Sequence, residues 1–266
     1  MFEIGGYLRE LTHEATEPVD YRLHTDHDSL GLNAALGRSI RIRFLGDKAC
    51  VHCGRKVTKL YQNGYCFPCV RTLAECDLCV VKPHECHYHQ GTCRDAAWGD
   101  AHCMIPHYVY LAVSSAPKVG LTRKGRELTR WVDQGAVAAV LFAEVPTRRQ
   151  AGELEMELAQ HIADKTNWRK MLADDVEETD LLTLRKQLID KLPSHWRSYV
   201  LDSVTVRRFS YPRAEDAQVA LQSLSLDRTQ TVEGRLIGVK GQYLLLSNGV
   251  FQVKKHVGYR VQISVL

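Results

Sequence analysis

Residues 107–145 read HYVYLAVSSAPKVGLTRKGRELTRWVDQGAVAAVLFAEV, and this stretch decides the fold class of the central part of the chain. It begins with the β-rich run 108–113, which is followed by Ser and Pro residues typical of a turn. A second short β-rich run covers 118–122. Because two such runs on either side of a short turn pair with each other, the sequence predicts a β-hairpin.

A helix, a buried strand and a second helix are predicted after the hairpin. Residues 126–134 fit a helix that stops at Gly135, and the continuous apolar run 136–145 fits a central strand. Thr147 is a typical N-cap residue, and the helix that it begins is expected to run to about Asp164. Strands and helices therefore mix, and the predicted fold class is α+β.

Glu155 is the acidic residue of the second helix whose position needs an explanation. The apolar stripe of this helix comprises Ala151, Leu154, Leu158 and Ile162. Glu155 lies about 55° from the centre of that stripe, at the edge of the buried face. An ionised carboxylate is costly there unless it is paired, hydrogen-bonded or metal-bound. Glu155 is therefore either such a functional residue, or a glutamate that extends to solvent at the rim or pairs with Arg148 or Arg149.

Basic residues gather around the hairpin and the first helix: Lys118, Arg123, Lys124, Arg126 and Arg130. Such a cluster is either an ordinary solvated face or a phosphate-binding surface beside a turn that contains glycine. We take Arg123, Lys124 and Arg126 as candidate nucleic-acid-binding residues.

Cysteine usage is the unusual feature of the composition, because all nine cysteines lie between Cys50 and Cys103. An odd number of cysteines favours metal-binding thiolates over a disulfide framework. The pairs Cys50-x2-Cys53 and Cys66-x2-Cys69 have the spacing of a zinc ribbon, in which two knuckles complete a tetrahedron. The sequence therefore predicts a structural zinc site at these four residues.

A second zinc ion is predicted just downstream, because four thiolates already close the first site. The expected ligands are Cys76, Cys79, Cys86 and Cys93. His87 and His89 are alternatives to Cys86 and Cys93, and whether His102 or Cys103 binds the metal stays open. Sites closed by four thiolates have no open position for water, so both zinc ions are expected to be structural.

The two ends of the chain resemble each other. Each contains a Tyr-Arg-Leu or Tyr-Leu-Leu run followed by a strand that alternates apolar and polar residues, and the final strands are expected at 37–44 and 258–265. Because a small hairpin sheet cannot bury its apolar face alone, we expect the two copies to pack together as one β module. The predicted division of the chain is 1–46, 47–106, 107–191 and 192–266.

The composition is that of a globular protein, with 45% hydrophobic and 25% charged residues among 266. No apolar run approaches the roughly 20 residues that span a bilayer, so we expect no membrane partner. With no basic and apolar leader at the start, we expect a cytoplasmic protein. The net charge of +4 permits binding of nucleic acid, and oligomeric state is not specified.

Tyr108-Val109-Tyr110, Lys118-Val119-Gly120, an arginine helix and a glutamate helix together resemble the GIY-YIG nuclease superfamily, and the Lys-Val-Gly form resembles its T5orf172-like relatives. This resemblance covers about residues 107–165. Most of the chain, with its cysteine-rich segment and the runs 131–136 and 164–168, resembles the bacterial family DUF2797. The resemblance implies a central GIY-YIG-like α/β/α domain between the zinc segment and the β module.

The nuclease resemblance also implies roles for residues. Tyr110 and Gly120 fall on the first and second motifs, and Lys118 stands where the second motif has its tyrosine. Arg130, with Arg126 as the alternative, fits the arginine of the helix, and Glu155 fits the glutamate that binds Mg²⁺ or Mn²⁺. The catalytic set implied in this way is Tyr110, Lys118, Arg130 and Glu155. Without the resemblance, the β-rich run favours Tyr110 as a strand tyrosine in the core.

Three functions are compatible with these observations. The first is a zinc-containing, metal-dependent endonuclease that acts on DNA or RNA. The second is a non-catalytic DNA- or RNA-binding protein that uses its zinc knuckles and basic residues. The third is a zinc-stabilised adaptor for protein interactions. Steep salt dependence of binding would separate the first two from the third, because phosphate contacts release counterions.

Overall fold

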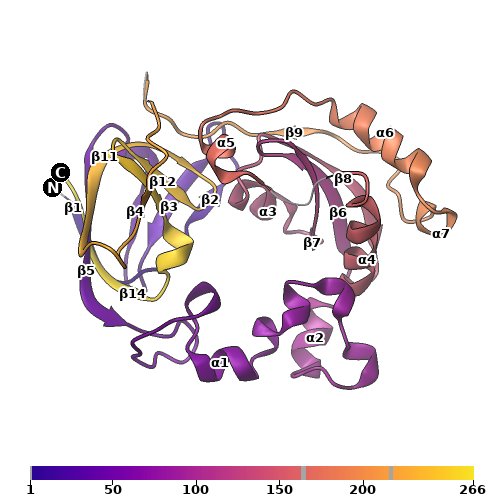
Figure 1. Ribbon diagram of the computed structural model, residues 1–266, viewed down its shortest axis with the longest axis horizontal. Helices are drawn as coiled ribbons and strands as arrows, with labels where there is room; N and C mark the ends of the chain where they lie inside the picture. The colour runs from indigo at the N-terminus through magenta and orange to yellow at the C-terminus, as the bar shows by residue number, and fades with distance from the viewer. Residues whose placement is uncertain (1, 163–165, 216–217) are drawn as a thin grey trace. The chain divides into compact units, whose positions relative to one another are not determined.

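The computed structural model describes residues 2–162, 166–215 and 218–266. It shows a mixed α+β fold with three sheets (Figure 1). The chain divides into two compact units. One is built from two separate stretches, Met1–Arg71 and Phe209–Leu266, and we call it the discontinuous unit. The other, Thr72–Arg208, is the continuous unit, so the boundary between them falls inside the cysteine-rich segment.

A seven-stranded sheet forms the centre of the discontinuous unit. In spatial order its strands are β1 (Phe2–Tyr7), β14 (Tyr259–Val265), β5 (Ser39–Lys48), β11 (Thr231–Lys240), β12 (Tyr243–Leu246), β13 (Gly249–Gln252) and β10 (Ser223–Leu224). β1 and β5 both pair antiparallel with β14, which places Ile4 and Ile42 opposite Ile263. The first and last strands of the chain are therefore neighbours, and the two expected alternating strands pair directly.

Alternation along these strands explains why the sheet forms. In β5, Ile40 and Ile42 are fully buried while Arg41 and Arg43 between and after them are exposed. This is the period-two pattern of a strand with one face on the core. A second sheet of the same unit has three strands, in the order β2 (Thr12–Glu14), β3 (Asp20–His24) and β4 (Ser29–Gly31).

The continuous unit contains a four-stranded sheet. Its order is β7 (Pro117–Arg123), β6 (His107–Val113), β8 (Ala138–Val145) and β9 (Arg207–Arg208). β6 and β7 form the predicted hairpin, and β6 also pairs antiparallel with β8. Between β7 and β8 lies α3 (Glu127–Asp133), which ends before Gly135, a glycine in the left-handed region with a φ of +66°.

Helix α4 (Arg148–Leu158) follows β8 and packs on this sheet. Its N-cap is Thr147, whose hydroxyl accepts a hydrogen bond from the Gln150 N–H. Ala151, Leu154 and Leu158 are buried, as the apolar stripe predicts. The helix ends earlier than expected, since the N–H groups of Gln160 and His161 donate to carbonyls three residues back, those of Glu157 and Leu158, as in a tightened 3₁₀ turn. The expected end, Asp164, lies outside the described residues.

The remaining helices are short. They are α1 (Phe67–Thr72), α2 (Ala96–His102), α5 (Trp168–Leu172), α6 (Leu181–Lys191) and α7 (Ser194–Arg197). Residues 74–90 form four single 3₁₀ turns rather than longer elements. Among the described residues, no helix has the length and apolar character that crossing a membrane requires.

Candidate functional site

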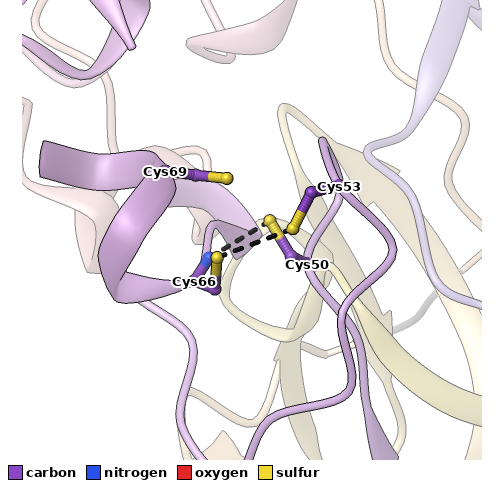
Figure 2. A group of neighbouring side chains, drawn as sticks. All are labelled: Cys50, Cys53, Cys66 and Cys69. Carbon is purple, nitrogen blue, oxygen red and sulfur yellow. Dashed lines mark hydrogen bonds between the residues drawn. The ribbon is translucent and has the colours of Figure 1, made fainter. Parts of the chain in front are cut away.

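Cys50, Cys53, Cys66 and Cys69 form one cluster in the discontinuous unit (Figure 2). Their Sγ atoms lie within 4.8 Å of one another, and 3.7 Å separates those of Cys53 and Cys66. A tetrahedral zinc ion with Zn–S bonds of about 2.3 Å sets its sulfur atoms about 3.8 Å apart. The cluster therefore has the size of a single tetrahedral site and can hold a zinc ion.

Two glycines shape the turns that bring these sulfurs together. Gly54, with a φ of +70°, closes the first turn by donating its N–H to the Cys50 carbonyl. Gly64 has a φ of +97°, and a Cβ there would lie 2.7 Å from the Val51 side chain. Larger residues would be strained at both positions. The second pair of cysteines, Cys66 and Cys69, comes directly after Gly64, and Cys69 lies in the first turn of α1.

The thiols of this cluster differ in their protonation. Burial disfavours the Cys50 thiolate, but hydrogen bonds from the backbone of Cys53, Cys66 and His52 outweigh burial and lower the pKa of Cys50 to about 6. The Cys66 N–H, for example, lies 3.2 Å from the Cys50 sulfur. Burial, together with the neighbouring thiols, raises the pKa of Cys69. Cys50 thus offers an incoming cation a thiolate at neutral pH.

The remaining cysteines lie in the continuous unit. Cys79, Cys86, Cys93 and Cys103 all line one small cavity. Cys76 is also buried, but it is not among the residues that line this cavity. All nine cysteines are free thiols. The predicted second set, Cys76, Cys79, Cys86 and Cys93, therefore shares three members with the group around the cavity.

The histidines that were alternatives to these cysteines make other contacts. The ring of His89 lies 2.9 Å from the Arg149 guanidinium, and the ring of His102 stacks on Trp98. His87 also lines the cavity, and its Nε2 lies 3.7 Å from an oxygen of Asp77. Of the three histidines, His87 is therefore the one that faces the cavity.

Tyr110 is the tyrosine that the nuclease resemblance implies to be catalytic. It has no exposed surface, and its ring lies over Gly120 on the neighbouring strand, where a Cβ would approach the Tyr110 hydroxyl to 2.6 Å. The hydroxyl donates to Oε1 of Gln134 at 2.9 Å, and the ring meets that of Trp131 edge to face. A residue sequestered in this way contacts protein groups on every side.

Charged residues from two helices act on this buried hydroxyl. Burial raises the pKa of Tyr110; the charge and hydrogen bonding of Arg130 oppose this rise, and the charge of Glu155 adds to it. Arg130 is exposed and Glu155 is half-buried. The structure thus brings the tyrosine of β6 into electrostatic contact with the arginine of α3 and the glutamate of α4.

Lys118 lies on the same side of the hairpin as Tyr110, because it is two residues from Gly120 along β7. It is only 4% exposed, and its ammonium group donates to the Thr166 hydroxyl at 2.7 Å. A buried lysine with a protein partner is held in place, so it is not a mobile surface charge.

The three candidate nucleic-acid-binding residues differ in exposure. Lys124 forms an ion pair of 2.8 Å with Glu144, which occupies its charge. Arg123 is half-buried, and both burial and the nearby charge of Arg126 lower its pKa. Arg126 itself is exposed at the start of α3. Lys124, Arg126 and Arg130 are therefore the exposed members of the predicted basic cluster.

Sequence reasoning missed two residues that the structure places at these sites. Gln134 is the hydrogen-bond acceptor of Tyr110, and nothing in its sequence context indicates this. Arg148 is half-buried, and its charge acts on the thiols of Cys103 and Cys79. A signal for Arg148 was present, because a cation in the first turn of a helix is disfavoured by the helix dipole and needs another partner.

These observations define a class: an α+β protein of two compact units, one of which carries a tetracysteine site for a zinc ion. The chain belongs to the family described as "Protein of unknown function (DUF2797)", whose family model matches residues 37–261. No curated protein and no solved structure matches the chain. The resemblance to GIY-YIG nucleases has no support from these comparisons.

Proposed function

We propose that the protein is a metal-dependent phosphodiester endonuclease whose reaction takes place in the continuous unit. The observation that carries the proposal is that Arg130 and Glu155, which come from different helices, both act on the hydroxyl of Tyr110. Phosphodiester hydrolysis needs a positioned water and neutralisation of the developing phosphate charge. A guanidinium and a carboxylate beside a fixed hydroxyl supply groups for both tasks.

Glu155 is the residue that would hold a divalent cation. Its carboxylate is half-buried, and carboxylate and water oxygens are the ligands that Mg²⁺ and Mn²⁺ prefer. When bound, such a cation supplies an activated water and neutralises negative charge on the phosphate. The exposed guanidinium of Arg130 would contact the phosphate directly, since Arg forms bidentate hydrogen bonds with phosphate oxygens.

Tyr110 and Lys118 would act behind these two residues. A hydroxyl without exposed surface does not touch a substrate, so Tyr110 is a positioning residue that fixes Arg130. Lys118 contributes a positive charge from the hairpin, held by Thr166. The zinc ion of the tetracysteine site is structural in this proposal, because four thiolates leave no position for a reacting water.

Cleavage of labelled DNA and RNA in Mg²⁺ or Mn²⁺ tests the proposal. We expect the wild-type protein to cleave at least one of these substrates. Arg130→Ala and Glu155→Gln should each lower the rate by about 100-fold or more, as removal of a charge-stabilising group does. The matched control is Glu153→Gln, since Glu153 lies on the same helix and pairs with Arg149. Equal rates for Glu155→Gln and Glu153→Gln would refute the proposal.

A non-catalytic nucleic-acid-binding function is the second candidate. The burial of both Tyr110 and Lys118 favours it, because the residues then accessible to a nucleic acid are basic ones such as Arg126 and Arg130. Binding that weakens steeply with salt, without cleavage, would support this function. Binding that is absent at all salt concentrations would leave the adaptor function.

A further inference from the structure

A small cavity lies within the turns of the continuous unit that follow the first zinc segment. Four cysteines line it from four different places: Cys79 from a 3₁₀ turn, Cys86 and Cys93 from the loops on either side of the turn 88–90, and Cys103 from the end of α2. Its volume is about 10 Å³. That is room for one water-sized occupant and not for a cluster of several metal atoms. The four sulfurs do not all lie within 4.8 Å of one another, so the turns that carry them would close further around a bound ion.

The segment around this cavity has little regular secondary structure. Residues 74–90 form only 3₁₀ turns, which are short and weakly hydrogen-bonded. Two of its larger apolar residues, Leu78 and Val81, are 53% and 72% exposed, so they do not form a core. Small segments without sufficient apolar burial are usually held by disulfides or metals. All nine cysteines are free thiols, so those around the cavity are available to bind a metal.

Asp77, Cys79 and His87 are a competing set of ligands, because one atom of each lies within 4.8 Å of the others. The carboxylate of Asp77 is already used. It lies 2.6 Å from the Arg94 guanidinium and accepts a hydrogen bond from the Cys79 N–H. A divalent cation on this carboxylate would face the charge of Arg94 at close range. The contacts of Asp77 therefore fit a residue that shapes the turn around Cys79.

Arg148 provides the charge that a thiolate site requires. Four thiolates and Zn²⁺ carry a net charge of −2, which is costly to bury without a positive partner. The Arg148 guanidinium donates to the Val80 carbonyl at 2.6 Å, and the backbone N–H of Arg148 donates to the Cys103 carbonyl at 2.8 Å. Its charge acts on Cys79 and Cys103. Its buried Nε has no hydrogen-bond partner among the described residues.

We propose that Cys79, Cys86, Cys93 and Cys103 bind a second zinc ion, and that Arg148 is its counter-charge. This set replaces Cys76 of the sequence-based prediction by Cys103. The cysteine loop packs tightly on α4, since a Cβ at Gly152 would lie 2.6 Å from both Pro83 and His84. The ion therefore fixes the loop against the helix that carries Glu155. The inference does not depend on the proposed nuclease function.

Zinc content of the purified full chain, measured by mass spectrometry of the metal, tests the site. We expect two zinc ions in the wild-type protein and in Cys76→Ser. Cys103→Ser and Cys93→Ser should each retain one, and Cys69→Ser should lose the other. Loss of one zinc ion in Cys76→Ser but not in Cys103→Ser would overturn the proposal. Loss in His87→Ala without loss in Cys93→Ser would show the competing set instead. Iron in place of zinc would also refute it.

Variants that keep the chain folded separate metal binding from general instability. Cys103→His provides a different zinc ligand at the same position, so it should restore the second zinc ion that Cys103→Ser loses. Arg148→Met should weaken the affinity of the second site for zinc by 10-fold or more, as loss of supporting partners does. Its matched control, Arg149→Met, should not. Equal zinc affinities of these two variants would rule out Arg148 as the counter-charge.

Discussion

Tyr110 and Gly120 show how two residues on neighbouring strands require each other. The tyrosine ring fills the space above the glycine, and its hydroxyl reaches Gln134 only from that position. Gly120 lies in a regular strand, so its backbone freedom is not what the position requires. What the position requires is the absence of a side chain. A strand glycine that permits such close approach marks a packed site.

Gly120→Ala should therefore lower the free energy of unfolding by about 1–3 kcal/mol, because the new methyl group overlaps the tyrosine ring. Tryptophan fluorescence in urea measures this directly, since all four tryptophans lie in the continuous unit. In a Tyr110→Ala background the same substitution should cost much less. An equal cost in both backgrounds would show that the ring is not the cause.

His107 makes the continuous unit sensitive to acid. Burial, together with the charges of Arg148 and Arg123, lowers its pKa to about 4, and a hydrogen bond with the Ile105 carbonyl only partly opposes this. Above pH 6.5 the folded and unfolded chains both keep it neutral. Between pH 6.5 and 4 only the unfolded chain takes up the proton. The free energy of unfolding therefore decreases as the pH is lowered through this range, by up to about 3 kcal/mol.

His107→Gln should remove this part of the acid sensitivity while it keeps a hydrogen-bond donor. The urea midpoint of the variant should then fall less steeply than that of the wild type between pH 6.5 and 4.5. His161→Gln, which changes an exposed histidine, is the control and should follow the wild type. If His107→Gln also follows the wild type, the buried ring does not determine the acid sensitivity.

At the scale of elements, helix α4 links local sequence signals to the sites. Its N-cap Thr147, its apolar stripe and the glycine that ends α3 were predictable, because each depends on neighbours within a few residues. The four-cysteine cluster was predictable from its spacing for the same reason. The partner of Arg148 was not, since its side chain contacts the Val80 carbonyl 68 residues away along the chain. The burial of Tyr110 agrees with the alternative that it is a strand tyrosine of the core, which its place in an apolar run already indicated.

Thr147→Ala should destabilise the continuous unit by about 1 kcal/mol, because the Gln150 N–H loses the hydroxyl that caps α4. Thr147→Ser keeps this hydroxyl and should cost much less. The comparison of their urea midpoints measures the cap. Equal destabilisation by both would indicate that the threonine methyl group matters instead.

At the scale of the whole molecule, each unit has its own sheet and core. The apolar cluster of the continuous unit is drawn entirely from residues of that unit, from Val109 on β6 to Trp196 on α7. The tetracysteine site belongs to the discontinuous unit, while the other five cysteines belong to the continuous one. The cysteine-rich segment is thus one region of the sequence that serves two units.

Residues 72–208, produced alone with zinc, should fold cooperatively, because their core needs no residue from outside. Dispersed amide signals and a single urea transition would show this. The same fragment with Leu154→Asp, which places a charge in the core, is the unfolded control. A fragment as disordered as this control would mean that the unit depends on the rest of the chain.

The pairing of β1 with β14 places the N- and C-termini side by side in one sheet (Figure 1). A short Gly-Ser linker could therefore join Val265 to Phe2, its partner in the register. Opening the chain at residues 71/72 and 208/209 would then yield a circularly permuted polypeptide, 209–266 followed by 1–71, in which all strands of the seven-stranded sheet lie on one uninterrupted chain. The native discontinuous unit and this continuous version would differ only in the order of the two segments along the chain. The contacts within the seven-stranded sheet would stay the same.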